Sequence, residues 1–221
     1  MAKPFQFKQF SVVQDNCAMK VGTDAVMLGA WSALDHMPKT ILDIGTGTGI
    51  LALMMAQRSE AELIDALEID PYAYEQCVRN FESSDWGDRL FCYHSSLKEF
   101  VDEINGTYDL IISNPPFYTE SYKSGNETRN KARFEDAMPF EELLSSAAKL
   151  LSITGKINVI IPFCEEVKFT TLAKKEGLYP SRILRVRGQK ESPVKRSLMC
   201  FTLQEKNVET VSYTHLRAHE T

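Results

Sequence analysis

The stretch Thr40-Ile41-Leu42-Asp43-Ile44-Gly45-Thr46-Gly47-Thr48-Gly49 decides the fold, together with the apolar run at residues 50–56. Residues 40–44 are typical of a short buried strand, and residues 50–56 have the apolar content of a buried helix. The three glycines between them let the backbone approach a ligand closely. The stretch therefore predicts a strand, a ligand-binding loop and a helix, the repeating unit of α/β proteins.

The glycine spacing narrows the choice of ligand. Folds that bind nicotinamide or flavin dinucleotides prefer G-x-G-x-x-G, whereas the third glycine here comes one residue early and Ile50 follows it. The loop also lacks the Gly-Lys-Ser/Thr ending of a phosphate-binding loop. The D-x-G-x-G-x-G pattern instead resembles motif I of the class I S-adenosylmethionine (SAM) methyltransferases, whose ligand offers an amino-acid end rather than phosphates.

A second predicted strand, residues 63–70, carries acids near its carboxyl end. It begins roughly twenty residues after the loop, the distance at which a doubly wound sheet brings a carboxylate to a ribose diol. Glu68 is preferred for that contact, and Ile69 adjoins it. Asp70 precedes Pro71 and is equally suited to be the N-cap of the next helix.

The tetrapeptide Asn114-Pro115-Pro116-Phe117 follows the apolar run at residues 108–113. Its prolines fix φ and supply no N–H, so the turn is stiff and its carbonyls stay free to accept from a substrate amine. A planar amine could be held for methylation by two hydrogen-bond acceptors and a stacking ring, here the Asn114 amide oxygen, the Pro115 carbonyl and the Phe117 ring. The alternative is an ordinary turn that ends a strand.

The remaining patterns complete one α/β domain. Further helices are predicted at 25–33, 71–83, 96–101, 139–151 and 165–176, and further strands at 89–94, 155–162, 182–187 and 197–203, the last two forming a hairpin. This order resembles the class I methyltransferase (Rossmann-like) fold, a seven-stranded, mostly parallel sheet with a closing antiparallel hairpin. We expect a single SAM-dependent methyltransferase domain at 1–207. Residues 211–221 have no helical or strand period, and residues 208–221 are expected to be a disordered, foreign tail.

Composition sets the context. The chain has 221 residues, a formal net charge of −5 and five scattered cysteines without a C-x-x-C pair, so we expect reduced thiols and no metal site. No apolar run is long enough to span a membrane and no leader is evident, which predicts a cytoplasmic protein without membrane contact. We expect a monomer.

The amino-terminal segments 5–15 and 19–31 resemble the bacterial valine-tRNA adenine N6-methyltransferases. The resemblance extends to about Leu203. It implies that Thr23 and Asp24 face the methionine end of SAM, although either residue could simply cap the following helix. The family's fold often has an acid after the third strand, where this chain has Ser95-Ser96, and Ser96 is retained as a candidate acceptor. The predicted cofactor-binding residues are Thr23, Asp24, Asp43, Gly45, Thr46, Gly47, Gly49, Glu68, Ile69 and Ser96.

Positive charge is concentrated in two segments of this acidic protein, the loop after Phe117 and the final hairpin. Clustered cations beside a pocket form an electrostatic footprint for phosphates, although a solvated polar surface is the alternative. The predicted tRNA-binding residues are Tyr118, Arg129, Arg133, Arg185, Arg187, Lys195 and Arg196.

Three functions are compatible with these motifs. The first is SAM-dependent N6-methylation of an anticodon-loop adenine in tRNA, position 37 of valine tRNA, with S-adenosylhomocysteine as the product. The second keeps the chemistry but changes the acceptor to a protein glutamine amide or to a guanine or cytosine amine of rRNA. The third is a non-catalytic RNA-binding module.

Overall fold

The computed structural model describes residues 4–15, 20–116 and 138–214. Its elements are β1 (Phe5–Gln6), β2 (Ser11–Val12), α1 (Thr23–Trp31), β3 (Thr40–Ile44), α2 (Ile50–Arg58), β4 (Leu63–Glu68), α3 (Pro71–Glu82), β5 (Leu90–His94), α4 (Leu97–Glu103), β6 (Tyr108–Ser113), α6 (Phe140–Leu150), β7 (Leu151–Pro162), the 3₁₀ turn η2 (Phe163–Glu165), α7 (Glu166–Lys175), β8 (Tyr179–Arg187), β9 (Val194–Thr202) and β10 (Glu209–Thr214).

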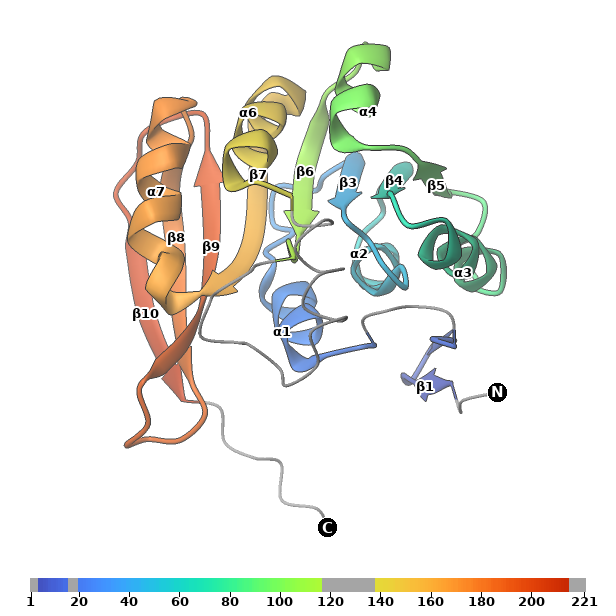
Figure 1. Ribbon diagram of the computed structural model, residues 1–221, viewed down its shortest axis with the longest axis horizontal. Helices are drawn as coiled ribbons and strands as arrows, with labels where there is room; N and C mark the ends of the chain where they lie inside the picture. The colour runs from blue at the N-terminus through green and yellow to red at the C-terminus, as the bar shows by residue number, and fades with distance from the viewer. Residues whose placement is uncertain (1–3, 16–19, 117–137, 215–221) are drawn as a thin grey trace, which may run out of the picture.

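Eight of the strands form one twisted sheet in the order β10-β8-β9-β7-β6-β3-β4-β5 (Figure 1). All neighbours are parallel except β9, which runs antiparallel to both β7 and β8. The predicted class of fold, a mostly parallel sheet closed by an antiparallel hairpin, is confirmed. Because the parallel strands β3, β4, β6 and β7 end at the same edge, the segments that follow them meet there.

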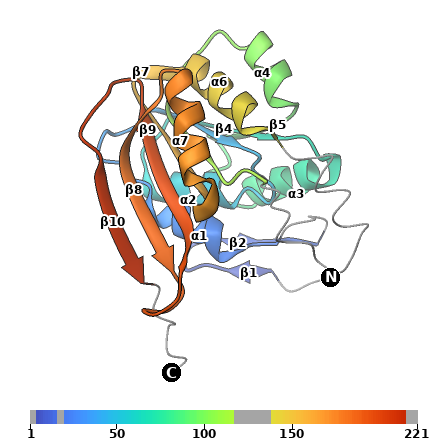
Figure 2. The ribbon, with the colours of Figure 1, turned by 60° about the vertical axis from the view of Figure 1, so that its left-hand side comes forward.

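The eighth strand differs from the prediction. Disorder was expected from residue 208, but Glu209–Thr214 pairs in parallel with Arg182–Arg187 along the outer edge of β8 (Figure 2). An edge strand exposes unpaired backbone N–H and C=O groups. Another extended segment can pair with these groups whatever its sequence, because the hydrogen bonds involve only the backbone. Residues 210–214 are rich in β-branched and aromatic side chains, which favour such pairing. Residues 215–221 lie outside the described part of the chain.

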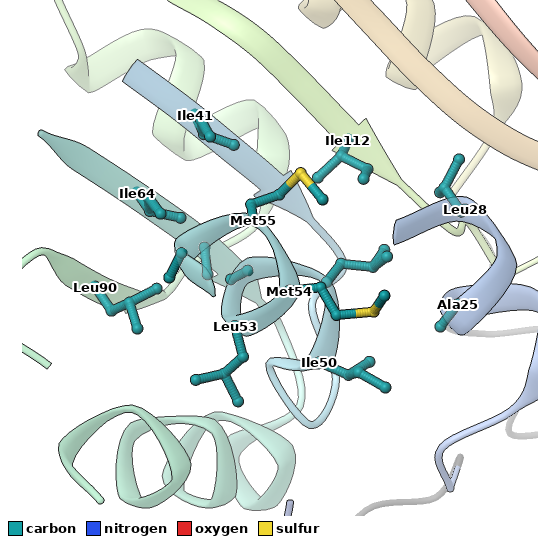
Figure 3. Close-up of a cluster of buried hydrophobic side chains, with 14 of the residues drawn as sticks. Ala25, Leu28, Ile41, Ile50, Leu53, Met54, Met55, Ile64, Leu90 and Ile112 are labelled. Atoms are coloured by element: carbon teal, nitrogen blue, oxygen red, sulfur yellow. The ribbon is translucent and has the colours of Figure 1, made fainter. Parts of the chain in front are cut away.

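Helices cover both faces of the sheet and give two hydrophobic cores. Helices α1, α2 and α3 pack on one face and α4, α6 and α7 on the other. Helix α2 is buried from Ile50 to Ala56 because α1 and α3 flank it as well as the sheet. In Figure 3 its Met55 extends toward Ile112 of β6, whereas its Leu53 points away from the strands. This packing holds the start of α2, and with it the glycine loop, in a fixed place.

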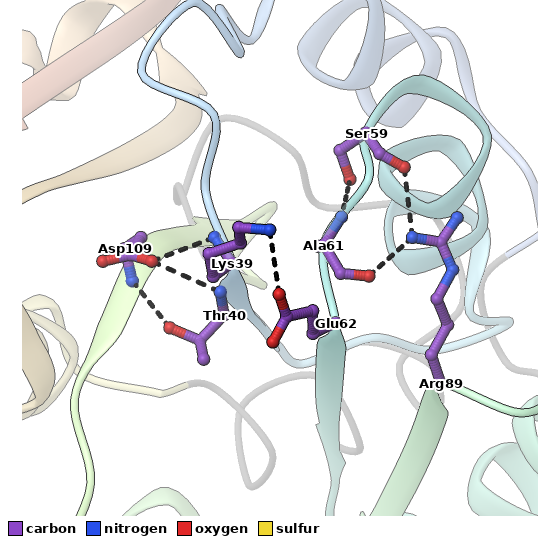
Figure 4. Close-up of polar contacts among 7 residues, drawn as sticks. All are labelled: Lys39, Thr40, Ser59, Ala61, Glu62, Arg89 and Asp109. Carbon is purple, nitrogen blue, oxygen red and sulfur yellow. Dashed lines mark hydrogen bonds and ion pairs between the residues drawn. The ribbon is translucent and has the colours of Figure 1, made fainter.

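Polar contacts fasten the opposite edge of the sheet, away from the glycine loop. Asp109 Oδ2 accepts hydrogen bonds from the backbone N–H groups of Lys39 (2.9 Å) and Thr40 (3.4 Å), which joins the start of β6 to the start of β3 (Figure 4). Arg89 donates to the carbonyls of Ser59 (3.1 Å), Ala61 (2.5 Å) and Ala56 (2.7 Å) at and beyond the end of α2. These contacts stabilise the scaffold and leave the carboxyl edge for the site.

The described residues contain no helix with the length and apolar character needed to cross a membrane. The same residues include no group of three or more His, Cys, Asp or Glu side chains that could hold a metal ion. Cys77, Cys92, Cys164 and Cys200 are free thiols, and Cys17 lies outside the described residues.

Candidate active site

Asp43 braces the glycine loop from inside. Its Oδ2 accepts from the Thr46 hydroxyl (2.5 Å) and from the Ala52 N–H (3.2 Å), which ties β3 to the loop and to the first turn of α2. The Asp43 side chain is fully buried, and desolvation raises its pKa to about 7. Through these bonds Asp43 positions the loop, and the direct cofactor contact predicted for it stays a prediction. Thr46 is also buried, with its hydroxyl bonded to Asp43.

The three loop glycines all have left-handed backbones, with φ of 72° at Gly45, 57° at Gly47 and 83° at Gly49. A Cβ added at Gly45 or Gly47 would meet no atom within 4 Å, so these two glycines face open space. A Cβ at Gly49 would lie 2.6 Å from the Phe81 ring and 3.0 Å from Cys77 Sγ. Gly45 and Gly47 therefore form a bare cradle, whereas Gly49 packs against α3, and the ligand contacts of all three stay predictions.

Glu68 ends β4 beside this cradle. Its Oε2 accepts from the Gly47 N–H (2.8 Å), and its Oε1 accepts from the N–H groups of Ile69 and Asp70 (both 2.9 Å). The carboxylate thus lies beside Gly47, and its contact with a ribose stays a prediction. Ile69 is 57% exposed, an apolar surface next to the cradle. Asp70 caps α3 by accepting from Ala73 N–H at 2.7 Å, which confirms the N-cap interpretation of that residue.

Ser96 has a structural task. It is the N-cap of α4, where its hydroxyl donates to Glu99 Oε2 (2.7 Å) and accepts from the Glu99 N–H (3.3 Å) in a capping box. These bonds also lower the pKa of Glu99. The hydroxyl is therefore already engaged, and its predicted cofactor contact stays a prediction.

Asn114 leaves the sheet next to the glycine loop. Ser113 pairs in register with Ile44, and its hydroxyl donates to the Ile44 carbonyl at 2.8 Å. Because Gly45 follows Ile44 and Asn114 follows Ser113, the two predicted motifs emerge side by side. The Asn114 side chain is half-buried and makes no hydrogen bond to any residue that the structure describes, and Pro115 is buried behind it. Phe117, Tyr118, Arg129 and Arg133 lie outside the described residues.

The amino-terminal segment rests against the same loop. The Asn80 side chain on α3 bonds to both the N–H and the carbonyl of Val13 (3.0 Å each) and donates to the Thr48 carbonyl at 2.8 Å. No sequence pattern indicates this link, because a lone helical Asn is ordinarily a surface residue. Gly22 is the N-cap of α1, so neither Thr23 nor Asp24 caps that helix with its side chain.

The predicted cations of the hairpin differ in their surroundings. Arg185 is committed to Glu166 of α7 through Nη2 (2.7 Å) and Nε (3.1 and 3.2 Å), and Ser197 donates to the same carboxylate at 2.5 Å. Although burial opposes it, these bonds lower the pKa of Glu166. Arg185 therefore forms a structural ion pair, and its predicted contact with tRNA stays a prediction. The sequence does not identify Glu166 as the partner of Arg185, because only the tertiary structure shows that this buried helical Glu faces β8.

The other hairpin cations lie near its turn. Arg187 ends β8 and donates to the Lys190 carbonyl at 3.2 Å, and the Lys195 side chain is exposed. Arg196 pairs with Asp24 at 2.8 Å, so two residues predicted for different ligands contact each other. Since Arg196 lies opposite Pro162, the carboxyl end of β7, this turn is at the same edge of the sheet as the cradle.

Solved structures share this fold. A predicted O-methyltransferase from Agrobacterium tumefaciens superposes with a TM-score of 0.66 at 19% identity, covering 90% of this chain and 89% of that one. A putative RNA methyltransferase from Pyrococcus horikoshii gives a TM-score of 0.58 at 18% identity, covering 80% and 82% of the two chains. The methyltransferase small domain family matches residues 23–172, and the chain belongs to it. The fold and site thus define a class I SAM-dependent methyltransferase.

Close relatives narrow the family further. The chain is 60% identical to the tRNA1(Val) (adenine(37)-N6)-methyltransferase of Christiangramia forsetii, over 92% of this chain and 85% of the relative. It is 62% identical to the protein of the same name from Flavobacterium johnsoniae, over 91% and 86%. A Bacteroides fragilis protein of that name is 47% identical over 91% and 85%. The chain belongs to this tRNA1(Val) (adenine(37)-N6)-methyltransferase family.

Proposed function

We propose that this protein transfers a methyl group from SAM to N6 of an adenine in tRNA, at position 37 of valine tRNA. The observation that carries the proposal is the emergence of Asn114 beside Gly45, in a chain up to 62% identical to enzymes of that name. It supports the proposal because the residue with the proposed acceptor-binding oxygen leaves the sheet next to the proposed cofactor cradle.

The residues present fit SAM. Gly45 and Gly47 offer a backbone surface with room for a ligand where any side chain would intrude. The Glu68 carboxylate has two acceptor oxygens for two ribose hydroxyls, and the three N–H groups that it accepts from hold it at the cradle. Ile69 provides an exposed apolar surface for the adenine ring. When bound, SAM supplies an electrophilic sulfonium methyl group.

Asn114 and Pro115 are proposed to act on the amine. The lone pair of adenine N6 is delocalised into the ring, which makes the nitrogen a poor nucleophile. Hydrogen bonds from the amine to the Asn114 side-chain oxygen and the Pro115 carbonyl draw electron density back onto N6, and the methylated, strongly acidic nitrogen loses its proton to water after transfer. Phe117 is proposed to stack on the base and fix the attack distance. The base must be unpaired to reach the site, as in a tRNA loop.

The tRNA is proposed to bind across the hairpin turn. Arg187 and Lys195 carry charge there without a carboxylate partner among the described residues, whereas Arg185 is neutralised by Glu166. Phosphate contacts of this kind release counterions, so affinity should fall steeply with salt. We propose that one domain, residues 1–207, acts as a cytoplasmic monomer. Tyr118, Arg129 and Arg133 remain proposed tRNA contacts.

The test is nucleoside mass spectrometry of valine tRNA incubated with the purified protein and SAM, with the Asn114→Ala variant as control. We expect N6-methyladenosine at position 37 only with the parental protein. The fragment that carries the modification identifies the position. Methylation of a protein glutamine amide or of an rRNA amine without methylation of tRNA would contradict the proposal and favour the alternative acceptors.

A further inference from the structure

The ion pair between Asp24 and Arg196 joins α1, early in the chain, to β9, late in the chain. Arg196 Nε donates to Asp24 Oδ2 at 2.8 Å, and the two side chains are 18% and 22% exposed. Asp24 lies in the first turn of α1, and Arg196 lies near the start of β9, 172 residues later in the chain. The pair is therefore a tertiary contact within reach of solvent.

The pair lies at the carboxyl edge of the sheet, the edge at which the cradle and Asn114 also lie. Ala25, next to Asp24, packs in the same cluster as Ile50, the first residue of α2 after the glycine loop (Figure 3). Arg196 lies opposite Pro162 of β7, the neighbour of the strand that ends at Asn114. Two strand spacings, roughly 10 Å, separate β9 from β6. An Arg at this position can therefore reach a phosphate next to a base held by Asn114.

Each partner of the pair is suited to a different ligand. The amino-acid end of SAM carries an ammonium group, which a carboxylate such as Asp24 attracts, and a tRNA phosphate attracts a guanidinium. We propose that the Asp24–Arg196 pair couples the two substrates: the ammonium of SAM takes Asp24 from Arg196, and Arg196 then binds a tRNA phosphate. This inference rests on the proposed function and adds to it an order of preference, cofactor before tRNA.

The geometry favours exchange at this pair and not at the neighbouring one. Asp24 accepts the Nε hydrogen bond of Arg196, whose Nη1 donates to the Lys195 carbonyl at 3.1 Å. Glu166, in contrast, holds Arg185 through two nitrogens and also accepts from Ser197, with its side chain only 8% exposed. The first pair can open toward a ligand, whereas the second is fixed in the scaffold.

The expected result is positive coupling that works in both directions. Saturating S-adenosylhomocysteine, which keeps the ammonium but has no methyl group to transfer, should tighten tRNA binding about 5-fold or more, and tRNA should tighten its binding by the same factor. 5′-Methylthioadenosine, which lacks the amino-acid end, should bind without changing tRNA affinity. This comparison uses the parental protein alone.

The experiment measures the dissociation constant of fluorescently labelled valine tRNA by anisotropy at one salt concentration, with and without each nucleoside. Asp24→Asn should bind tRNA more tightly than the parent when no nucleoside is present, and Arg196→Gln should bind it more weakly. Both should show no coupling. Arg196→Lys should keep part of the coupling, and Lys195→Gln should weaken tRNA binding but keep the parental coupling factor. Thermal unfolding confirms that each variant is folded.

Suppose first that the parental protein methylates tRNA. Equal tRNA affinity with and without S-adenosylhomocysteine would then overturn the inference alone, and so would an unchanged coupling factor in Arg196→Gln. Equal effects of S-adenosylhomocysteine and 5′-methylthioadenosine would also overturn it, because the ammonium would then play no part. Failure of the parent to bind or methylate tRNA would overturn the proposed function together with the inference.

Discussion

Two similar substitutions in the glycine loop should destabilise the fold to different extents. Gly49→Ala should destabilise the fold strongly, and Gly47→Ala should do so mildly. Both residues have positive φ, which costs a non-glycine residue about 1–2 kcal/mol. At Gly49 the new methyl group also meets Phe81 at 2.6 Å and Cys77 at 3.0 Å, both buried and unable to move aside, which adds about 1–3 kcal/mol of overpacking. At Gly47 it meets nothing within 4 Å.

Taking the middle of these ranges, Gly49→Ala should lose about 3.5 kcal/mol and Gly47→Ala about 1.5 kcal/mol. At 2–4 °C per kcal/mol for a chain of this size, Tm should fall by roughly 7–14 °C and 3–6 °C respectively. Differential scanning calorimetry measures the two shifts, and isothermal titration measures SAM binding, which we expect at micromolar Kd, about −7 to −9 kcal/mol. Gly47→Leu should abolish this binding with no larger Tm loss than a strained backbone explains. Equal Tm values for the two Ala variants, or parental SAM affinity in Gly47→Leu, would refute the assignment of one glycine to packing and the other to the ligand.

Three further predictions concern single side chains. Asn114→Ala should keep SAM affinity within a few-fold and lower turnover by about 10²-fold or more, measured by methyl transfer to tRNA, and a parental rate would move the acceptor pocket elsewhere. Because burial raises the pKa of Asp43 to about 7, the native state holds a proton between about pH 4 and pH 7 that the unfolded state has lost. The free energy of unfolding should therefore fall as pH rises through this window, relative to Asp43→Asn. Denaturant titrations check this, and a difference between the two proteins that does not change with pH would contradict it. Arg89→Ala leaves three carbonyls without their donor and should cost roughly 2–3 kcal/mol, whereas Arg79→Ala, which breaks an exposed pair with Glu75, should stay within about 0.5 kcal/mol in the same assay.

The parts that the sequence determined are those encoded locally. The apolar run at 40–44, the glycines after it and the buried helix follow from periodicity and from the backbone freedom of glycine, and the structure has each of them. Asp70 was predicted as the N-cap of α3 because Pro71 follows it. The position of Glu68 beside the loop was predicted from its spacing along the chain. The mostly parallel order of strands follows from alternating β and α segments.

The tertiary structure decided which polar groups meet. Asp43 is a brace behind the loop because the sheet buries it, and Arg185 is a scaffold residue because a buried Glu166 faces it from α7. Asp24 and Arg196 contact each other across 172 residues, a distance at which no sequence period operates. The strand at Glu209–Thr214 forms because β8 offers an unpaired edge. Local patterns determine the helices, strands and turns, whereas the pairing and burial of charges depend on which elements the folded sheet brings together. For this reason the cradle could be predicted from the sequence, and only the fold showed which residues surround it.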